Sequence, residues 1–355
     1  MANEDKKATL LARLQKATEL EIATIPPYMV ALLSMKLSSN REAANLIRSV
    51  MIEEMLHLAL VANVLNAVGG TVHIGPDTIP SYPLQMNFKG QAFKDREFAV
   101  DLAPFSKDNI QTFMKIEEPL KPIPVRATLL KSEIDIPGLT IGEFYESIVL
   151  LLEELDAAEP GTLFIGDPAR QLHEDYYWAG GGKIIPVSDL VSAKAALDIV
   201  IVQGEGAWPG AHGKIAFSTD APLMMGHYYR YSEIYYQRLY KQGDNPADPP
   251  TGEPLPIDYS AVYPIKVNPK ARDYAPGSDL AKLNLAFNER YTMMLKQLLQ
   301  ALSGTPKELY TAIMNGMHGL TSTAKGMMST PIPGDSKGRN GCPTFDWVEV
   351  PESKA

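Results

Sequence analysis

Apolar residues recur along residues 8–37 at the spacing of an amphipathic helix. One stripe, with steps of three, four and seven residues, contains Leu10, Leu14, Ala17, Glu21, Tyr28, Leu32 and Met35. Residues 41–68 form a second apolar stretch, rich in Ala, Leu, Met and Ile, and it ends at Gly69-Gly70, a pair typical of a helix C-terminus. Because only residues 38–40 separate the two stretches, we expect two long antiparallel helices.

The pattern changes over residues 70–139, which contain eight of the 28 prolines. This stretch has no long helical period, which predicts loops with short strands or short helical turns. A long insertion in a compact domain is usually functional. We therefore expect it to shape a substrate pocket, together with a glycine-rich turn within residues 175–187.

Helical periodicity returns in five later stretches: 140–158, 188–203, 222–242, 279–302 and 306–326. Ser188 is a suitable N-cap for the second of these stretches, and Pro222 is a suitable first residue for the third. The last two are expected to pack as a helical hairpin. Residues 243–278 are expected to wrap the surface, and the tail from residue 330 to be loosely ordered.

These elements predict an all-α fold in one elaborated domain, residues 1–355, rather than two sequential domains. A helical bundle would span residues 8–242 and carry the insertion 70–139. The hairpin 279–326 and the irregular tail 330–355 would follow it.

Composition narrows the function classes. Lys plus Arg number 33 and Asp plus Glu number 42, so the formal net charge is −9. This charge argues against a nucleic-acid partner, which needs a basic surface. The single cysteine, Cys342, excludes an internal disulfide and a cysteine-based metal cage. No apolar run reaches the length of a membrane span and the first residues lack an apolar signal core, so we expect a cytoplasmic protein without a membrane partner.

The sharpest chemical signal is Glu54-x-x-His57 in the second helix. This spacing places a carboxylate and an imidazole on one helix face, one turn apart. In di-iron bundles such a pair contributes one carboxylate and one nitrogen to a metal. The alternative is a solvated glutamate and a hydrogen-bonded histidine. Neighbouring apolar residues such as Leu56 and Leu60 favour the metal, because a buried carboxylate is costly unless it is paired or bound to a cation.

Glu21 occupies a position of the first helix where a leucine would be expected. It lies about 25 Å from the turn and Glu54 lies about 21 Å from it, at a rise of about 1.5 Å per residue, so the two carboxylates fall at similar heights. A divalent metal would resolve their repulsion. Glu19 is the alternative if the helix has another phase. Pro26-Pro27 are expected to bend the helix and open a cavity beside the metal, unless the helix stops and restarts there.

The helix predicted over 140–158 offers Glu143 and Glu146. It is apolar nearly all round, so either glutamate needs a partner, and the helical phase does not choose between them. Glu205 is a further candidate at the end of the next helix. Its flanking glycines would allow the backbone to approach a site closely, although they also suit an ordinary turn.

His227 and Glu233 lie on the helix predicted over 222–242. Their spacing of six residues does not give a shared face. Glu233 lies three residues after Arg230, which predicts an ion pair between them. His227 is therefore the better candidate ligand. The many tyrosines of this helix are expected to be core or interface residues, with one of them a hydrogen-bonding or redox-active neighbour of the metal.

Taken together, these motifs resemble the ferritin-like domain of the iminophenylpyruvate dimer synthases of bisindole (violacein-type) biosynthesis. The resemblance covers roughly residues 8–240 and is shared by stand-alone bacterial proteins of similar length. The matching motifs are LE-x-x-TIPPY from Leu20, EEMLH from Glu53, N-x-LNA-x-GG from Asn63, IGEFY from Ile141 and QGEG from Gln203.

The resemblance implies a four-helix bundle that holds a dinuclear metal centre, with two iron ions or with manganese. The ligands that it implies are Glu21, Glu54, His57, Glu143, Glu205 and His227. Its IGEFY motif selects Glu143 over Glu146. The chain departs from the family pattern in the helix predicted over 222–242, which has no Glu-x-x-His motif. A mononuclear or asymmetric site is therefore an alternative.

Two hypotheses of function follow. The first is a non-haem metal oxidoreductase that activates dioxygen or peroxide to oxidise a small amino-acid-derived or secondary-metabolism substrate. The second is a non-catalytic metal-binding or scaffold protein with the same bundle. Storage of iron in a shell is disfavoured because the insertions would obstruct a cage. The sequence leaves open the substrate, partner enzymes and whether the chain forms a homo-oligomer.

Overall fold

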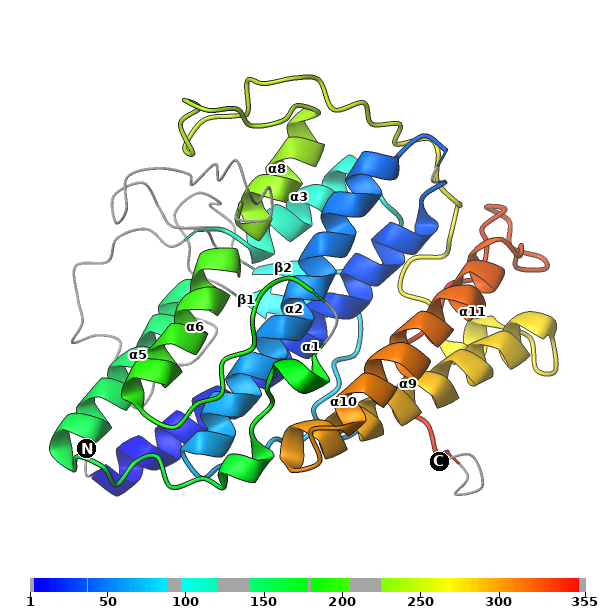
Figure 1. The fold of residues 1–355 in the computed structure, drawn as a ribbon. Coiled ribbons are helices and arrows are strands. Elements are labelled where there is room, and N and C mark those ends of the chain that lie inside the picture. The colour runs from blue at the N-terminus through cyan, green and yellow to red at the C-terminus, as the bar shows by residue number, and fades with distance from the viewer. Residues whose placement is uncertain are drawn as a thin grey trace.

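A long antiparallel hairpin of two helices is the centre of the fold (Figure 1). The computed structural model describes residues 3–36, 38–87, 97–119, 141–177, 180–204 and 225–350. Helices α1 (Asn3–Ser34) and α2 (Arg41–Ala67) form the hairpin, as predicted. Helix α1 begins five residues earlier than expected and continues through Pro26-Pro27, so it does not stop and restart there.

Two helix pairs cover one side of this hairpin, one pair at each end (Figure 1). Helices α5 (Ile141–Ala158) and α6 (Leu190–Gly204) pack against α1 and α2 near the N-terminus of α1. Helices α3 (Lys107–Ile116) and α8 (His227–Tyr236) pack against each other and cover the opposite end. The C-terminus of α3 and the N-terminus of α8 therefore meet the other pair near the middle of the hairpin.

The insertion after α2 contains more structure than its sequence indicated. Strands β1 (Leu84–Asn87) and β2 (Glu97–Val100) pair antiparallel, with Leu84 opposite Val100. Helix α3 follows directly, and Ser106 caps it by accepting a hydrogen bond from the backbone N–H of Asn109. The predicted short strands are confirmed, and the short helix α3 brings part of the insertion into the bundle.

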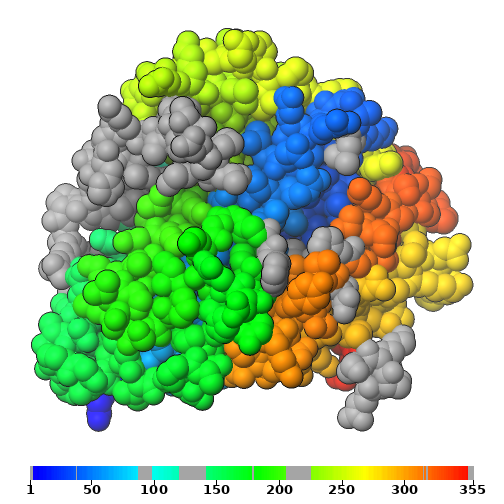
Figure 2. Space-filling view, in the orientation of Figure 1, coloured from blue at the N-terminus to red at the C-terminus, as the bar shows by residue number. Residues whose placement is uncertain are grey.

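The C-terminal hairpin packs on the other side of α1 and α2 (Figures 1 and 2). Its first arm is α9 (Asp279–Ser303), and its second arm contains α10 (Glu308–Thr311), the π-helix η6 (Ala312–Met317) and α11 (His318–Met328). The hairpin is thus confirmed. The π-helical segment interrupts its second arm, which sequence periodicity did not indicate.

The irregular segments are anchored. The segment between α8 and α9 runs along the end of the α1–α2 hairpin, where the Tyr263 N–H donates to the Ser34 carbonyl at 2.8 Å. In the tail, the Cys342 N–H donates to the Tyr274 hydroxyl at 2.9 Å, and Phe345 is buried. The expectation of a loosely ordered tail is therefore wrong for residues 330–350. Its buried side chains fill space against α9.

The bounds of two helices, α6 and α8, differ from those predicted. Helix α6 begins at Leu190, and Asp189 rather than Ser188 accepts a hydrogen bond from the Ser192 N–H at 2.8 Å. Helix α8 begins at His227, because the backbone of Gly226 before it is not helical, and the predicted first residue, Pro222, lies outside the described residues. It ends at Tyr236, where the left-handed backbone of the next residue stops it. His227 therefore lies at a helix N-terminus instead of within a helix.

Helix α2 is apolar and long enough to cross a membrane by length and composition alone. However, 89% of its most apolar window is buried inside the structure. This burial fits a core helix enclosed by α1, α6, α8 and α9. The described elements form the predicted all-α bundle, and the core lies around α2.

Candidate metal centre

Two buried groups of carboxylates and imidazoles lie where the helix pairs meet. The first group is Glu21, Glu54 and His57, and the second is Glu54, Glu117 and His227. In each group one candidate ligand atom from every residue lies within 4.8 Å of the others. Glu54 belongs to both groups, so the structure describes two adjoining positions that share one carboxylate.

Helix geometry explains the first group. Glu54 and His57 are one turn apart on α2, and Glu21 lies at the same height on α1, as the sequence predicted. The His57 Nδ1 atom lies 3.5 Å from Glu21 Oε2. Thr24, one turn after Glu21, donates a hydrogen bond to Glu54 Oε2 at 3.1 Å. The α1–α2 hairpin alone therefore builds this half of the centre.

The second group combines α2 with two helix ends. Glu117 is the residue that caps the C-terminus of α3, and His227 is the first residue of α8. The His227 Nδ1 atom lies 2.9 Å from Glu54 Oε1 and 3.5 Å from Glu117 Oε2. All three side chains are buried, so water does not compensate their charges.

Each imidazole is held by its other nitrogen. The His57 Nε2 atom lies 3.0 Å from Gln203 Oε1, while Gln203 Nε2 donates to the Gly181 carbonyl at 2.7 Å. The His227 Nε2 atom lies 3.1 Å from Glu53 Oε2, and Arg230 donates to that same oxygen at 2.9 Å. These acceptors place the proton on Nε2 in both rings. The lone pair of each Nδ1 atom is then directed toward the carboxylates.

Two tyrosines hold the outer carboxylates. The Tyr145 hydroxyl of α5 donates to Glu21, and the Tyr28 hydroxyl of α1 donates to Glu117. Burial, followed by the charge of the adjacent glutamate, raises the pKa of each tyrosine well above its usual value. Both hydroxyls therefore stay protonated and remain donors. Tyr231 packs against Tyr28 on the same side.

The buried acidic and imidazole groups of the cluster shift one another's pKa values. Burial, then the charges of Glu117 and Glu21, raises the pKa of Glu54 well above its usual value. For Glu21, burial acts in the same direction, but the hydrogen bond and charge of His57 outweigh it and lower the pKa. Burial would lower the pKa of His227, yet the three glutamates around it raise it. A bound divalent cation would offset the same buried negative charge.

The residues fit a divalent metal by a further test. His227 Nδ1 is fully buried and faces two carboxylates, but among the described residues it makes no well-directed hydrogen bond to either of them. Such a nitrogen is costly to bury unless something binds its lone pair. Carboxylate oxygens and imidazole nitrogens are the ligands that iron and manganese accept. A cavity of about 20 Å³ adjoins Glu21, Glu54, His57 and Glu117, enough for a water-sized molecule.

The structure brings together four of the six predicted ligands: Glu21, Glu54, His57 and His227. Glu205 lies outside the described residues. Glu143 is half-buried on α5 and belongs to neither group, and the exposed Glu146 does not either. Tyr145 of the IGEFY motif reaches the site through its hydroxyl, which donates to Glu21. The role of Glu143 as a ligand stays a prediction.

The remaining alternatives have other contacts. Glu19 forms an ion pair with Lys16 at 2.9 Å on the half-buried side of α1. Glu233 is buried and accepts a hydrogen bond from the Tyr240 N–H at 2.7 Å. Arg230, the expected partner of Glu233, forms its ion pair with Glu53 at 2.9 Å.

Sequence reasoning missed Glu117 and Glu53. Glu117 ends a ten-residue helix inside the insertion, where no long apolar period marks a buried face. The only available signal was that a long insertion tends to be functional. Glu53 is fully buried beside Glu54. The signal that could have identified it is the pair of adjacent glutamates, Glu53-Glu54, within an apolar helix.

A family model described as ferritin-like matches residues 14–236, more than half of the chain. The chain belongs to the ferritin-like family. The matched range runs from within α1 to the end of α8 and includes every member of both buried groups. The family assignment thus agrees with the bundle and with the position of the site inside it.

Two curated relatives are distant enzymes. The chain is 26% identical over 335 residues to dichlorochromopyrrolate synthase of Lentzea aerocolonigenes, a match that covers 84% of this chain and 29% of the relative. It is 26% identical over 275 residues to 2-imino-3-(indol-3-yl)propanoate dimerase of Chromobacterium violaceum, covering 67% of this chain and 23% of the relative. The chain thus matches less than a third of the length of either relative.

A solved structure supports the fold. A ferritin-like protein from Caulobacter vibrioides superposes with a TM-score of 0.58 and 22% sequence identity. The superposition covers 90% of this chain and 94% of the other. The likeness therefore extends beyond the bundle to most of the chain, including much of the part after residue 236.

Proposed function

We propose that this protein is a metal-dependent oxidoreductase with a dinuclear non-haem centre. The observation that carries the proposal is the pair of buried glutamate–histidine groups that share Glu54. Iron is the ion we expect, and manganese has similar ligand preferences. When bound, these ions would exchange electrons with dioxygen or peroxide.

The residues of the chain have distinct tasks in this proposal. Glu54 would contact both ions, Glu21 and His57 would complete one position, and Glu117 and His227 the other. Gln203 and the Glu53–Arg230 pair orient the two imidazoles, a type of support that commonly strengthens metal binding. Apolar side chains of the surrounding helices exclude bulk water, which strengthens every electrostatic interaction inside.

The names of the distant relatives support a substrate class. One is named as a dimerase of 2-imino-3-(indol-3-yl)propanoate, an imine derived from an amino acid. We propose a related small molecule here. Coupling two such molecules through a new carbon–carbon bond removes two electrons and two protons. One dioxygen would accept them and become hydrogen peroxide, or one hydrogen peroxide would accept them and become two waters.

The test loads the purified protein anaerobically with Fe(II), removes unbound iron and measures metal by elemental analysis. We expect two ions per chain, and a change in the electronic spectrum with oxygen consumption when air is admitted. Glu54→Gln should lose both ions. Glu19→Gln is the matched control on α1, because Glu19 lies outside both groups, and it should keep both.

The substrate class is tested separately. Loaded protein would be mixed with the imine generated in the assay from L-tryptophan by an amino-acid oxidase, which also supplies peroxide. A coupled product detected by mass spectrometry, absent with Glu54→Gln, supports the proposal. Iron binding without any spectral change in air would instead favour the non-catalytic metal-binding protein. Wild-type protein that binds neither iron nor manganese would refute both.

A further inference from the structure

A second cavity lies on the side of the α1–α2 hairpin that faces away from the metal centre. Its volume is about 340 Å³, at the lower end of the range of small-molecule sites. Its walls come from α1, α2, the turn at Tyr176 and the second arm of the C-terminal hairpin. A smaller apolar cavity of about 50 Å³ adjoins it and shares Met29, Met55 and Ile313.

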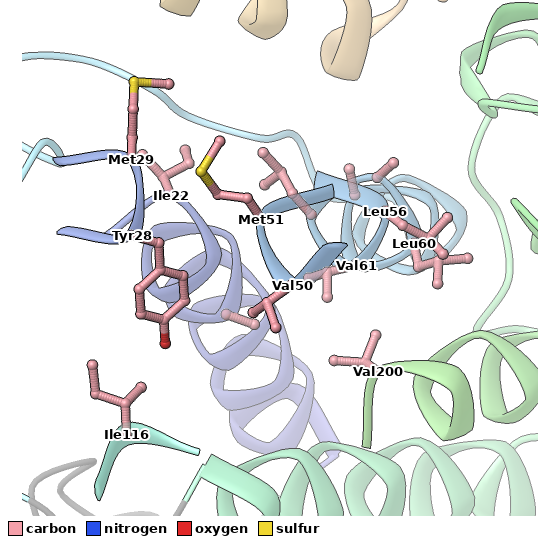
Figure 3. Close-up of a cluster of buried hydrophobic side chains, with 14 of the residues drawn as sticks. Ile22, Tyr28, Met29, Val50, Met51, Leu56, Leu60, Val61, Ile116 and Val200 are labelled. Atoms are coloured by element: carbon pink, nitrogen blue, oxygen red, sulfur yellow. The ribbon is translucent and has the colours of Figure 1, made fainter. Parts of the chain in front are cut away.

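This cavity is separate from the metal centre. Met29 follows Tyr28 on α1, and Met55 follows Glu54 on α2, so each pair points to different sides of its helix. Figure 3 shows Met29 and Met51 on one side of the hairpin and the Tyr28 hydroxyl on the other. The two helices therefore stand between the second cavity and the carboxylates.

The wall is apolar and adaptable. Four methionines line it, and methionine is flexible and common at surfaces that accept varied ligands. These are Met29, Met51, Met55 and Met314. Met314 is 43% exposed and the neighbouring Tyr310 is 52% exposed, so the apolar surface continues to the mouth of the cavity. Met314 also belongs to the π-helix η6, a feature that occurs often at functional sites.

The charge of the cavity has one sign. Arg48 and Lys325 are the charged side chains among the described residues that line it, and no carboxylate is among them. Both cations are exposed. Arg48 donates to the neutral Asn45 side chain at 2.8 Å and forms no ion pair with any described residue. An apolar cavity with cations at its mouth is complementary to a molecule with an apolar body and a negative end.

We propose that this cavity binds an amphipathic organic carboxylate. Because a water molecule occupies about 30 Å³ in the liquid, the cavity has the volume of roughly ten water molecules, which is room for a body of roughly ten non-hydrogen atoms. The body would lie among the methionines, and the carboxylate would meet Arg48 and Lys325. Aliphatic and aromatic carboxylates share this chemistry, and decanoate and indole-3-propionate are the probes that distinguish them.

The test measures binding to the wild-type metal-loaded protein by calorimetry, with decanoate, indole-3-propionate and uncharged decan-1-ol. We expect at least one carboxylate to bind, and more weakly at high salt because ions screen exposed charges. The double variant Arg48→Gln/Lys325→Gln should weaken carboxylate binding roughly ten-fold and leave decan-1-ol unchanged. The control Arg41→Gln/Lys282→Gln removes two exposed cations outside the cavity and should change neither.

Two further variants locate the site. Met314→Trp should block both carboxylate and alcohol binding by filling the mouth, with a melting temperature that shows it still folds. Glu54→Gln should leave carboxylate binding unchanged, which separates this site from the metal centre. The proposal is overturned if neither carboxylate binds at millimolar concentration, if the Arg48/Lys325 variant binds as tightly as its control, or if folded Met314→Trp binds like the wild type.

Discussion

The two halves of the metal centre are built differently. Glu21 and His57 lie within helices of 32 and 27 residues, and a neutral amide, Gln203, holds the imidazole. Glu117 and His227 lie at the ends of ten-residue helices, and the Glu53–Arg230 ion pair holds the imidazole. The first half is thus fixed by continuous secondary structure, and the second by charged side chains.

This difference has a physical consequence. A residue at the end of a short helix has fewer neighbours to restrain it, so its position depends more on side-chain contacts. Buried ion pairs are strong restraints only while both partners are present. The second half should therefore be the more sensitive to single substitutions, and the first half the more robust.

The largest difference is expected from Arg230→Met. Glu53 would keep a fully buried charge without its cation, which costs about 3–5 kcal/mol of unfolding free energy. Urea unfolding measures this loss. The exposed Arg238→Met is the control and should change little. Adding Glu53→Gln to Arg230→Met should recover part of the stability. If it does not, the stranded charge is not the cause.

Gln203→Leu makes the corresponding change in the first half. It removes the acceptor for His57 without leaving a buried charge, so we expect about a 10- to 100-fold loss of affinity for one ion and little loss of stability. Metal titration followed by elemental analysis checks this. Gln203→Glu keeps an acceptor oxygen and should lose less affinity. Equal losses of unfolding free energy in Gln203→Leu and Arg230→Met would contradict the proposed difference between the two halves.

Two tyrosines provide a further comparison of the two halves of the metal centre. Tyr28→Phe and Tyr145→Phe each remove one hydroxyl that donates to an outer glutamate, in the second and first half respectively. We expect each to cost about 1–3 kcal/mol, because each hydrogen bond goes to a charged acceptor. Thermal unfolding of the metal-free proteins gives both values. A larger cost for Tyr28→Phe agrees with a less restrained second half, and a larger cost for Tyr145→Phe speaks against it.

The smallest effect concerns pH. Burial raises the pKa of Glu233 to about 7, although the Tyr240 N–H and Arg230 oppose this shift. The protonated acid is favoured in the folded state, so its contribution to stability is present at low pH and is lost as pH rises through about 7. Glu233→Gln should therefore lose less stability between pH 5 and pH 8 than the exposed control Glu253→Gln. If the two variants lose the same unfolding free energy between pH 5 and pH 8, the raised pKa of Glu233 is contradicted.

The same contrast explains what the sequence could predict. Glu21, Glu54 and His57 lie on periodic helices joined by a short turn, so spacing alone placed them at one height. His227 was identified as a candidate, but its place at a helix N-terminus was not. Glu117 was missed because its side chain becomes buried only when α3 packs against α8. No local pattern in the insertion records that packing.

The contacts that orient the imidazoles were harder still to predict from the sequence. Gln203 meets His57 across a large separation in sequence and is itself held by the Gly181 carbonyl, and neither residue type marks a metal site by itself. The second cavity was also not visible, because it forms between α2 and a hairpin more than two hundred residues later. Periodicity predicts helices and their faces, but which faces meet is decided by tertiary packing.

The central claim is that two ions share Glu54, and crystals of the iron-loaded protein test it most directly. Anomalous diffraction measured at the iron absorption edge should show two peaks beside Glu54. One should contact Glu21 and His57, and the other Glu117 and His227. No peak at Glu54, or a single peak in crystals soaked with excess iron, would contradict the account.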